Sequence, residues 1–326
     1  MSAKVLGIGN ALVDILVRIP SDNILDTFGL PRGSMQLINA ERSAEIFESV
    51  KTLSPSMVSG GSASNTINGL ANLGIETGMV AMIGDNELGN FFLQDMKNSG
   101  VQPHFFTSQT RTGSCISLIS PDSERTLATC LGAAIELTAD NINEQIFDGY
   151  SYFYAEGYLV QNAELIETAL RIAHEKGLTT CLDLASYNVV EDNLEFLKRL
   201  IHKYVDVVFA NEEEATAFTG KEDIEALNEI GELADIVIIK LGCKGSIVKW
   251  GENITRVGII PANSIDTTGA GDLYAAGFLY GMIKGFTPEK CAEAGAILSG
   301  NVIEVVGPKM DTQRWNRIRQ SIKQLN

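Results

Sequence analysis

The chain has 326 residues, of which 45% are apolar and 20% are charged, and its formal net charge is −16 at pH 7. This balance is typical of a globular protein, and the length suffices for one large α/β domain with an appendage. The negative charge argues against nucleic acid or an anionic membrane as a partner, because both require a positive protein surface.

The cysteines and histidines argue against a disulfide-linked protein and against a zinc-binding protein. The five cysteines are odd in number, widely spaced and without a CxxC pair, so neither a disulfide framework nor a zinc cluster is expected. The three histidines show no metal-ligand spacing. The apolar N-terminus contains Asp14 and lacks a cleavage pattern, and no run approaches the ~20 apolar residues of a membrane span. We therefore expect a soluble protein of the reducing cytoplasm.

The N-terminal third begins with two strands around a Gly-Asn turn. Residues 4–9 are typical of a buried parallel strand, whereas residues 12–19 alternate and then stop at Pro20, which indicates a strand that leaves the main sheet. A half-exposed strand is expected at 33–39, between helices at 22–29 and 41–53.

From about residue 57 the pattern alternates between strands and helices, which predicts βαβ units and a parallel sheet. Residues 104–130 interrupt it with a hairpin signal and no helix, so we expect these strands in a small second sheet. The expected strands are 76–83, 151–155, 178–183, 206–210 and 235–240, with antiparallel edge strands at 244–249 and 254–260. The expected helices are 87–99, 162–176, 192–203, 271–284, 288–305 and 311–324.

Residues 263–285 contain a strand end, a loop of small residues and the start of a helix. The backbone N–H groups of Thr267 to Gly271 are free to bind an anion at the helix N-terminus. Asp272 lies beside this anion hole, where crowding with negative charge raises a carboxyl pKa and favours a general base. The alternative from the residues alone is that Asp272 only caps the helix.

Two N-terminal glycine turns suggest a binding site for hydroxyl groups. Gly60 and Gly61 allow the backbone to approach a ligand, and Asn65 on the following helical turn can donate and accept hydrogen bonds. The turn after residue 8 lacks the third glycine of GxGxxG, which excludes a dinucleotide fingerprint. Asp14 suits a vicinal diol because a carboxylate accepts two hydroxyls at once; the alternative is a strand-end carboxylate in water.

An acidic run follows the strand expected at 206–210. Asn211 and Glu214 are one helical turn apart and are able to order the water shell of Mg²⁺, which keeps several waters and bridges phosphates. The alternative is that acidic residues in a first helical turn only suit the helix dipole. No GxxxxGK[ST] occurs, so the chain is not a P-loop phosphotransferase.

In combination and in order, these signatures resemble those of the PfkB, or ribokinase-like, family of carbohydrate and nucleoside kinases. The stretches concerned are GGSASN at 60–65, Gly84-Asp85, NEEE at 211–214, KLGCKG at 240–245 and DTTGAGD at 266–272. The resemblance implies one ribokinase-like α/β domain over residues 1–326. It would have three layers, α/β/α, around a mainly parallel central sheet, and a small β-sheet lid formed by segments 12–40 and 104–130.

The resemblance also implies roles for individual residues. In catalysis, Asp272 would be the general base, and the backbone of Gly269, Ala270 and Gly271 would stabilise the transferring phosphoryl group. The acceptor would be bound by Asn10, Asp14, Gln36, Gly60, Gly61, Asn65 and Tyr158. The nucleotide would be bound by Arg125, Asn211, Lys240, Gly242, Gly245, Thr268 and Asn301, and Asn211 and Glu214 would contact Mg²⁺ through water.

The implied reaction is transfer of the γ-phosphoryl group of ATP, with Mg²⁺, to a primary hydroxyl of a ribose-containing acceptor. GNALVDI, GSMQLIN and AEGYLV resemble the adenosine-kinase branch, which favours adenosine, with Gln36 at a purine edge and Tyr158 stacking on the base. A ribose or fructose kinase is the alternative within the family. A non-catalytic nucleoside-binding or regulatory protein is the alternative of another class. We expect a monomer or a lid-mediated homodimer, and the preferred phosphoryl donor and any monovalent ion remain open.

Overall fold

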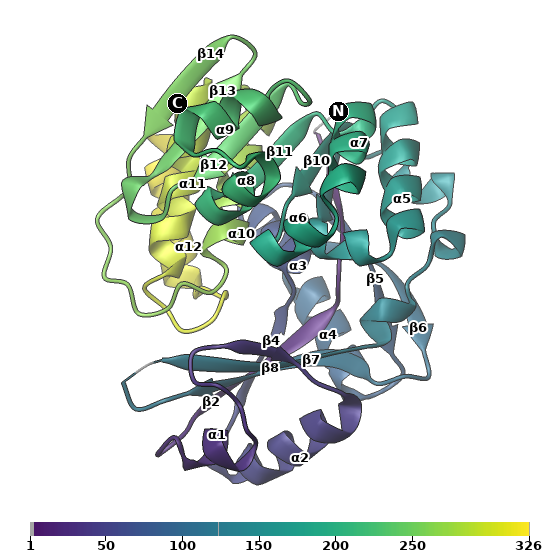
Figure 1. The fold of residues 1–326 in the computed structure, drawn as a ribbon, viewed down its shortest axis with the longest axis vertical. Coiled ribbons are helices and arrows are strands. Elements are labelled where there is room, and N and C mark those ends of the chain that lie inside the picture. Colours follow the sequence, from purple (N-terminus) through teal and green to yellow (C-terminus); the bar gives the residue numbers. More distant parts are fainter. Residues whose placement is uncertain (1–2, 123, 326) are drawn as a thin grey trace.

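The computed structural model describes residues 3–122 and 124–325, which form a large lobe and a small one (Figure 1). Within these residues the large lobe contains a nine-stranded sheet in the order β14-β13-β12-β11-β10-β9-β1-β5-β6. Its strands are β1 (Val5–Ile8), β5 (Thr77–Gly84), β6 (Val101–Ser108), β9 (Tyr152–Glu156), β10 (Thr179–Asp183), β11 (Val207–Asn211), β12 (Ile236–Lys240), β13 (Ser246–Trp250) and β14 (Asn253–Val257). Pairing is parallel from β6 to β12, and β13 and β14 are antiparallel, as predicted.

Helices cover both faces of the large sheet, which gives the three-layer ribokinase-like α/β/α architecture. Alternate strand residues enter different cores: Val5 belongs to one hydrophobic cluster and Leu6 to the other. The first face packs on α3 (Ser62–Asn72), α4 (Glu87–Asn98), α10 (Ala270–Ile283), α11 (Pro288–Val302) and α12 (Thr312–Lys323). The second packs on α5 (Ala163–Glu175), α6 (Tyr187–Asp192), α7 (Leu194–Tyr204), α8 (Glu212–Thr219) and α9 (Asp223–Ile230).

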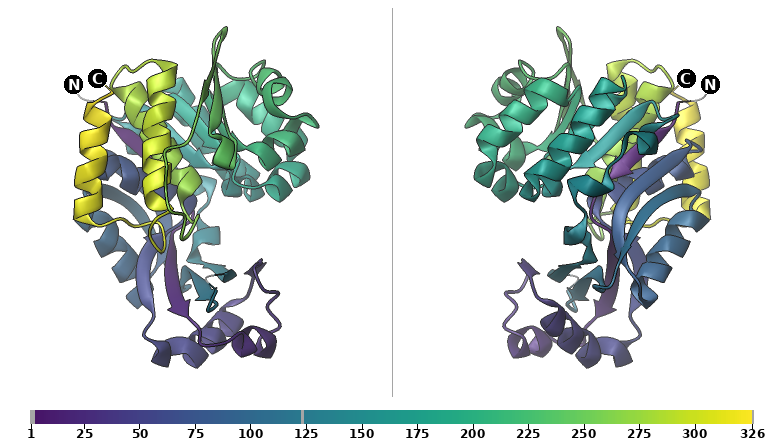
Figure 2. Two further views of the ribbon diagram at one scale, coloured as in Figure 1. Left: turned by 90° about the vertical axis from the view of Figure 1, so that its left-hand side faces the viewer. Right: turned by 90° about the vertical axis from the view of Figure 1, so that its right-hand side faces the viewer.

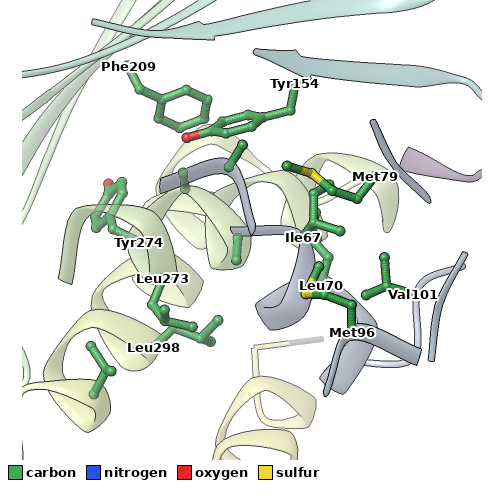
Figure 3. Close-up of a cluster of buried hydrophobic side chains, with 14 of the residues drawn as sticks. Ile67, Leu70, Met79, Met96, Val101, Tyr154, Phe209, Leu273, Tyr274 and Leu298 are labelled. Atoms are coloured by element: carbon green, nitrogen blue, oxygen red, sulfur yellow. The ribbon is translucent and has the colours of Figure 1, made fainter. Parts of the chain in front are cut away.

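The core of the first face joins segments that are far apart in the sequence. Figure 3 shows Ile67 and Leu70 of α3 beside Met79 of β5, with Leu273 of α10 close by. All four side chains are almost completely buried, and burial of each such side chain contributes about 1.5–3 kcal/mol. This packing fixes α3 and α10 against each other, so the first turns of both helices are held at one place.

The small lobe is a five-stranded sheet in the order β3-β8-β7-β2-β4, with two helices at its outer side (Figures 1 and 2). Its strands are β2 (Leu12–Arg18), β3 (Met35–Leu37), β4 (Ser56–Gly60), β7 (Thr112–Ile119) and β8 (Arg125–Gly132), and its helices are α1 (Asn23–Thr27) and α2 (Ala40–Val50). The strand at 12–19 therefore leaves the main sheet, as predicted.

Two strands belong to a different sheet from the one expected. β6 pairs in parallel with β5 from Thr77↔Val101 to Gly84↔Ser108, so residues 104–108 lie in the large sheet. β4 pairs antiparallel with β2, so residues 56–60 lie in the small sheet. The small sheet thus does not coincide with segments 12–40 and 104–130. The reason is that hydrophobic alternation identifies a strand but not its partner, which is set by long-range pairing.

No helix within residues 3–122 and 124–325 combines the length and the apolar character needed to cross a membrane.

Candidate active site

Several of the predicted site residues lie at the carboxyl ends of the parallel strands, facing the small sheet. Asn10 follows β1, Asn211 and Lys240 end β11 and β12, and Asp272 lies in the first turn of α10. Loops beyond the carboxyl ends of parallel strands are where α/β sheets bind ligands. The fold thus gathers residues that are up to 262 positions apart in the sequence, from Asn10 to Asp272.

Asp272 is held by the first turn of α3. Ser62 Oγ donates to Asp272 Oδ1 at 2.7 Å, and Asn65 Nδ2 donates to Oδ2 at 2.9 Å. Burial raises the pKa of Asp272 above its usual value, although these two hydrogen bonds oppose the rise. The N-cap of α10 is Gly269, and no side chain caps this helix, so Asp272 is not its cap. A fixed carboxylate with a raised pKa has the properties of a general base.

The loop before Asp272 forms the expected turn into a helix N-terminus. Gly269 has φ +75°, a conformation that favours glycine. A Cβ on Gly271 would lie 3.2 Å from Lys240 Nζ, so the lysine ammonium group lies against the loop. Lys240 Nζ also pairs with Asp183 Oδ2 at 2.9 Å. Burial lowers the pKa of Lys240, but the carboxylates of Asp183 and Glu214 outweigh it and raise the pKa. A protonated lysine therefore adds positive charge beside the helix N-terminus.

Arg125 joins the small sheet to this loop. Its Nη1 donates to Thr268 Oγ1 at 2.7 Å, and its Nη2 forms an ion pair with buried Asp266 at 2.6 Å. Asp266 also accepts a hydrogen bond from Thr268 N at 3.0 Å. Because Arg125 is the first residue of β8, the small lobe contacts the anion hole directly. Arg125 and Thr268, both expected to bind the nucleotide, are thus in contact.

Asp14 lies on the face of the small sheet that carries Cys115 and Thr129, according to the strand register. Its carboxyl group occupies the space beside Gly60, where a Cβ would lie 2.4 Å from the carboxyl carbon. Burial and the nearby carboxylate of Asp272 together raise the pKa of Asp14 to about 7, although the charge of Lys309 opposes the rise. The negative charge of Asp272 therefore acts on the carboxyl group of Asp14, and the two groups belong to one site.

Glu156 is a site residue that the sequence analysis missed. It ends β9, and its Oε1 accepts hydrogen bonds from Asn10 N at 2.9 Å and Asn10 Nδ2 at 2.7 Å. Its Oε2 accepts from Ala63 N at 2.9 Å. Burial raises the pKa of Glu156 to about 7. The available signal was an acidic residue directly after an apolar strand, at the edge where the other motifs end.

Glycine is required at position 61, between these elements. Gly61 has φ +94°, and a Cβ there would lie 2.2 Å from Asn10 O. Glu156 and Gly61 therefore fix the turn after β1 against the start of α3, and with it the Asn10 amide. Because Nδ2 of Asn10 donates one of its two N–H groups to Glu156, Oδ1 and the second N–H are left to meet a ligand.

Asn211 and Glu214 contact each other. Asn211 N and Nδ2 donate to the two carboxylate oxygens of Glu214 at 2.8 Å and 2.7 Å, and Glu214 N donates to Asn211 Oδ1 at 2.8 Å. This is a capping box at the start of α8. Glu214 is 2% exposed, and burial raises its pKa to about 7. These residues fit a hydrated cation better than a directly bound one, and residues 3–122 and 124–325 contain no cluster of three acidic, His or Cys ligands.

The remaining predicted residues lie in three separate segments of the chain. Gly242 (φ +54°) and Gly245 (φ +91°) form the turn between β12 and β13, next to Lys240. Tyr158 follows β9, and burial together with the charge of Glu156 raises its pKa to about 12. Asn301 lies near the end of α11, where its Nδ2 donates to Ile297 O at 2.8 Å.

Gln36 is not brought to the site. It pairs with Ala128, whereas its neighbour Leu37 pairs with Thr129, and Thr129 pairs with Cys115 beside Asp14. Partners in register point to the same face, so Gln36 points to the face opposite Asp14. Its Nε2 donates to Ser34 Oγ at 3.1 Å. The expected contact of Gln36 with a purine therefore does not fit this structure.

Comparison with known proteins shows which families and structures this chain is similar to. The model of the pfkB family carbohydrate kinases matches residues 34–314. The crystal structure of adenosine kinase from Sinorhizobium meliloti is 34% identical, with a TM-score of 0.88 over 98% of this chain and 100% of that chain. A probable sugar kinase protein from Rhizobium etli is 32% identical, with a TM-score of 0.89 over 100% and 99% of the two chains.

A curated adenosine kinase from Schizophyllum commune is 25% identical over 98% of this chain and 99% of its own length. These similarities cover both lobes and support the resemblance to the adenosine-kinase branch. The protein is a sugar or nucleoside kinase, that is, a phosphotransferase with an alcohol group as acceptor. From the match over residues 34–314 we conclude that the chain belongs to the pfkB family of carbohydrate kinases.

Proposed function

We propose that the protein transfers the γ-phosphoryl group of ATP to the 5′-hydroxyl of adenosine, which yields AMP and ADP. The observation that carries this proposal is the Asp272 carboxylate, oriented by Ser62 and Asn65 beside the N-terminus of α10. The adenosine kinases among the full-length relatives favour this acceptor.

Asp272 accepts the proton of the acceptor hydroxyl as the oxygen attacks the γ-phosphorus. The new O–P bond forms while the bond to the β-phosphate oxygen breaks, and ADP leaves. The N–H groups of Gly269, Ala270 and Gly271 hold the negative charge of the phosphoryl group, and Lys240 adds positive charge behind them. For Ala270 this requires its N–H to leave Thr267 O, which accepts it at 3.1 Å. Catalysis then consists of positioning and electrostatic stabilisation.

The acceptor's ribose hydroxyls bind to Asp14 and to the Asn10 amide, against the backbone of Gly60 and Gly61. Tyr158 contributes an aromatic surface for the base. Thr268 and Arg125 contact the phosphates, and Gly242, Gly245 and Asn301 face the rest of the nucleotide. The small sheet acts as a lid that excludes water, which otherwise competes as the acceptor.

Mg²⁺, when bound with the nucleotide, neutralises phosphate charge and orients the phosphates. In this chain Asn211 and Glu214 would order its water shell from the start of α8. Their mutual hydrogen bonds keep both side chains in one orientation. We place the enzyme in the cytoplasm, in purine salvage, as a monomer or a dimer through the lid sheet; five free cysteines are compatible with a reducing compartment.

A sugar kinase is the second candidate, because the relative that is 32% identical over the whole chain is a probable sugar kinase. The test is ADP release from MgATP with adenosine, other nucleosides, ribose, fructose and fructose phosphates. Turnover with adenosine that disappears in Asp272→Asn supports the proposal. Turnover with a free sugar alone assigns the second candidate, and nucleoside binding without ADP release would contradict both.

A further inference from the structure

Lys309, in the loop between α11 and α12, presents a buried ammonium group with spare hydrogen-bond donors. Its Nζ is shielded from solvent and has no well-formed hydrogen bond within the part of the chain that the structure describes. This Nζ forms an ion pair with Asp95 Oδ2 at 3.3 Å. An ammonium group carries three donors, so this single pair leaves capacity unused. A buried cation of this kind requires a further partner.

Asp95 of α4 fixes the position of Lys309. The same Oδ2 accepts hydrogen bonds from Ser59 N at 3.1 Å and Ser59 Oγ at 2.5 Å. Partial burial raises the pKa of Asp95, but the charge of Lys309 and the bonds from Ser59 outweigh it and lower the pKa. Asp95 is therefore an anion that ties Lys309 to the end of β4. Ser59 directly precedes Gly60, the residue over which the Asp14 carboxyl lies.

The charge of Lys309 also acts on Asp14. The groups whose charges act on Asp14 are the cations Lys309 and Arg125, the carboxyls Asp272 and Asp266, and the neighbouring thiol of Cys115. Arg125 is already engaged by Asp266. Lys309 exerts the largest favourable charge effect on Asp14, and the charge of Asp14 in turn acts on Lys309.

We propose that Lys309 is the counter-ion of Asp14 and a positioning residue for the acceptor. Held by Asp95, it favours the ionised form of the Asp14 carboxyl group, in which both oxygens accept hydroxyl groups of a vicinal diol. A protonated carboxyl would present one donor in place of an acceptor and bind the diol poorly. This inference rests on the proposed function for the nature of the acceptor.

The first experiment compares Lys309→Met with the wild type in steady-state kinetics between pH 5.5 and 9. The KM for the acceptor should rise about tenfold for each unit by which the pKa of Asp14 increases, since one unit is a factor of ten in ionisation. The acidic limb of kcat/KM should move to higher pH, and the defect should shrink above pH 8. The KM for MgATP should stay within about twofold, and Lys309→Arg should restore most of the affinity.

Two controls separate this role from a structural one. In an Asp14→Asn background, Lys309→Met should add little to the acceptor KM, because the charge it compensates is gone. An acceptor KM that rises equally at all pH values, or that rises again in the Asp14→Asn background, would overturn the inference.

A second measurement requires no substrate. Carbon-13 NMR of aspartate carboxyl groups in the free protein, with Asp14→Asn to assign the signal, should show Asp14 titrating at higher pH in Lys309→Met. An unchanged titration refutes the role of Lys309 whatever the acceptor is. If the wild type turns over only a sugar, the adenosine proposal fails, while the shift in the Asp14 titration still decides the inference.

Discussion

Replacement of Asp272 by Asn removes the proposed base without removing its hydrogen-bond network. Ser62 Oγ can continue to donate to the remaining oxygen. The Oδ1 of Asn65 is buried without a hydrogen-bond partner, so rotation of the Asn65 amide supplies an acceptor for the new NH₂ group. Both existing contacts of Asp272 therefore have a counterpart in the variant, and we expect the fold to be retained.

The loss of activity follows from the loss of the proton acceptor. General-base catalysis contributes typically 10²- to 10⁴-fold. At 1.36 kcal/mol for each factor of ten, the barrier should rise by about 2.7–5.4 kcal/mol. The free energy of unfolding should stay the same or increase. Because burial raises the pKa of Asp272, its ionised form is disfavoured in the folded state, so an amide should be as stable or more stable at pH 7.5.

The assay is single-turnover ADP formation at saturating MgATP and acceptor, with the melting temperature measured on the same preparation. Ser62→Ala is the matched control, because it removes one hydrogen bond to Asp272 and leaves the carboxylate in place. It should lose much less activity than Asp272→Asn. A rate for Asp272→Asn within tenfold of the wild type, in a protein with unchanged melting temperature, would refute the assignment of the base.

Three further predictions concern the turn, a buried acid and the metal. Gly61→Ala should cost about 1–3 kcal/mol in urea unfolding and raise the acceptor KM, because φ is +94° and a carbonyl oxygen lies 2.2 Å from the new Cβ; Gly74→Ala, with φ +84° and free space, should cost less and leave the KM unchanged. The melting temperature of Glu156→Gln relative to the wild type should increase from pH 5 to pH 8. The pKa of Glu156 in the folded protein is about 7, so its stabilising protonated state is lost as pH rises. A difference in melting temperature that stays constant from pH 5 to pH 8 would contradict the raised pKa of Glu156. Glu214→Ala should raise the Mg²⁺ concentration for half-maximal rate, and Glu213→Ala, an exposed neighbour, should not; equal Mg²⁺ dependence of the two variants would exclude the metal role.

The sequence alone indicated most elements and the residues around the anion hole, because these signals are local. Hydrophobic periodicity predicted the βαβ alternation, and small residues before Asp272 predicted a turn into a helix N-terminus. The positive φ of Gly269 and the first-turn place of Asp272 agree with that expectation. Only the position of Ser62 and Asn65 in space distinguishes a held carboxylate from a helix cap.

Tertiary structure decided what depends on pairing between distant segments. The sheet to which β4 and β6 belong follows from their partners, and the one-residue register of β3 turns Gln36 away from the site. Glu156 meets Asn10 across 146 positions of sequence. The ion pair between Lys309 and Asp95 forms because the loop after α11 lies against α4. No local pattern encodes such contacts, since they arise from the closure of long loops and the burial of whole faces.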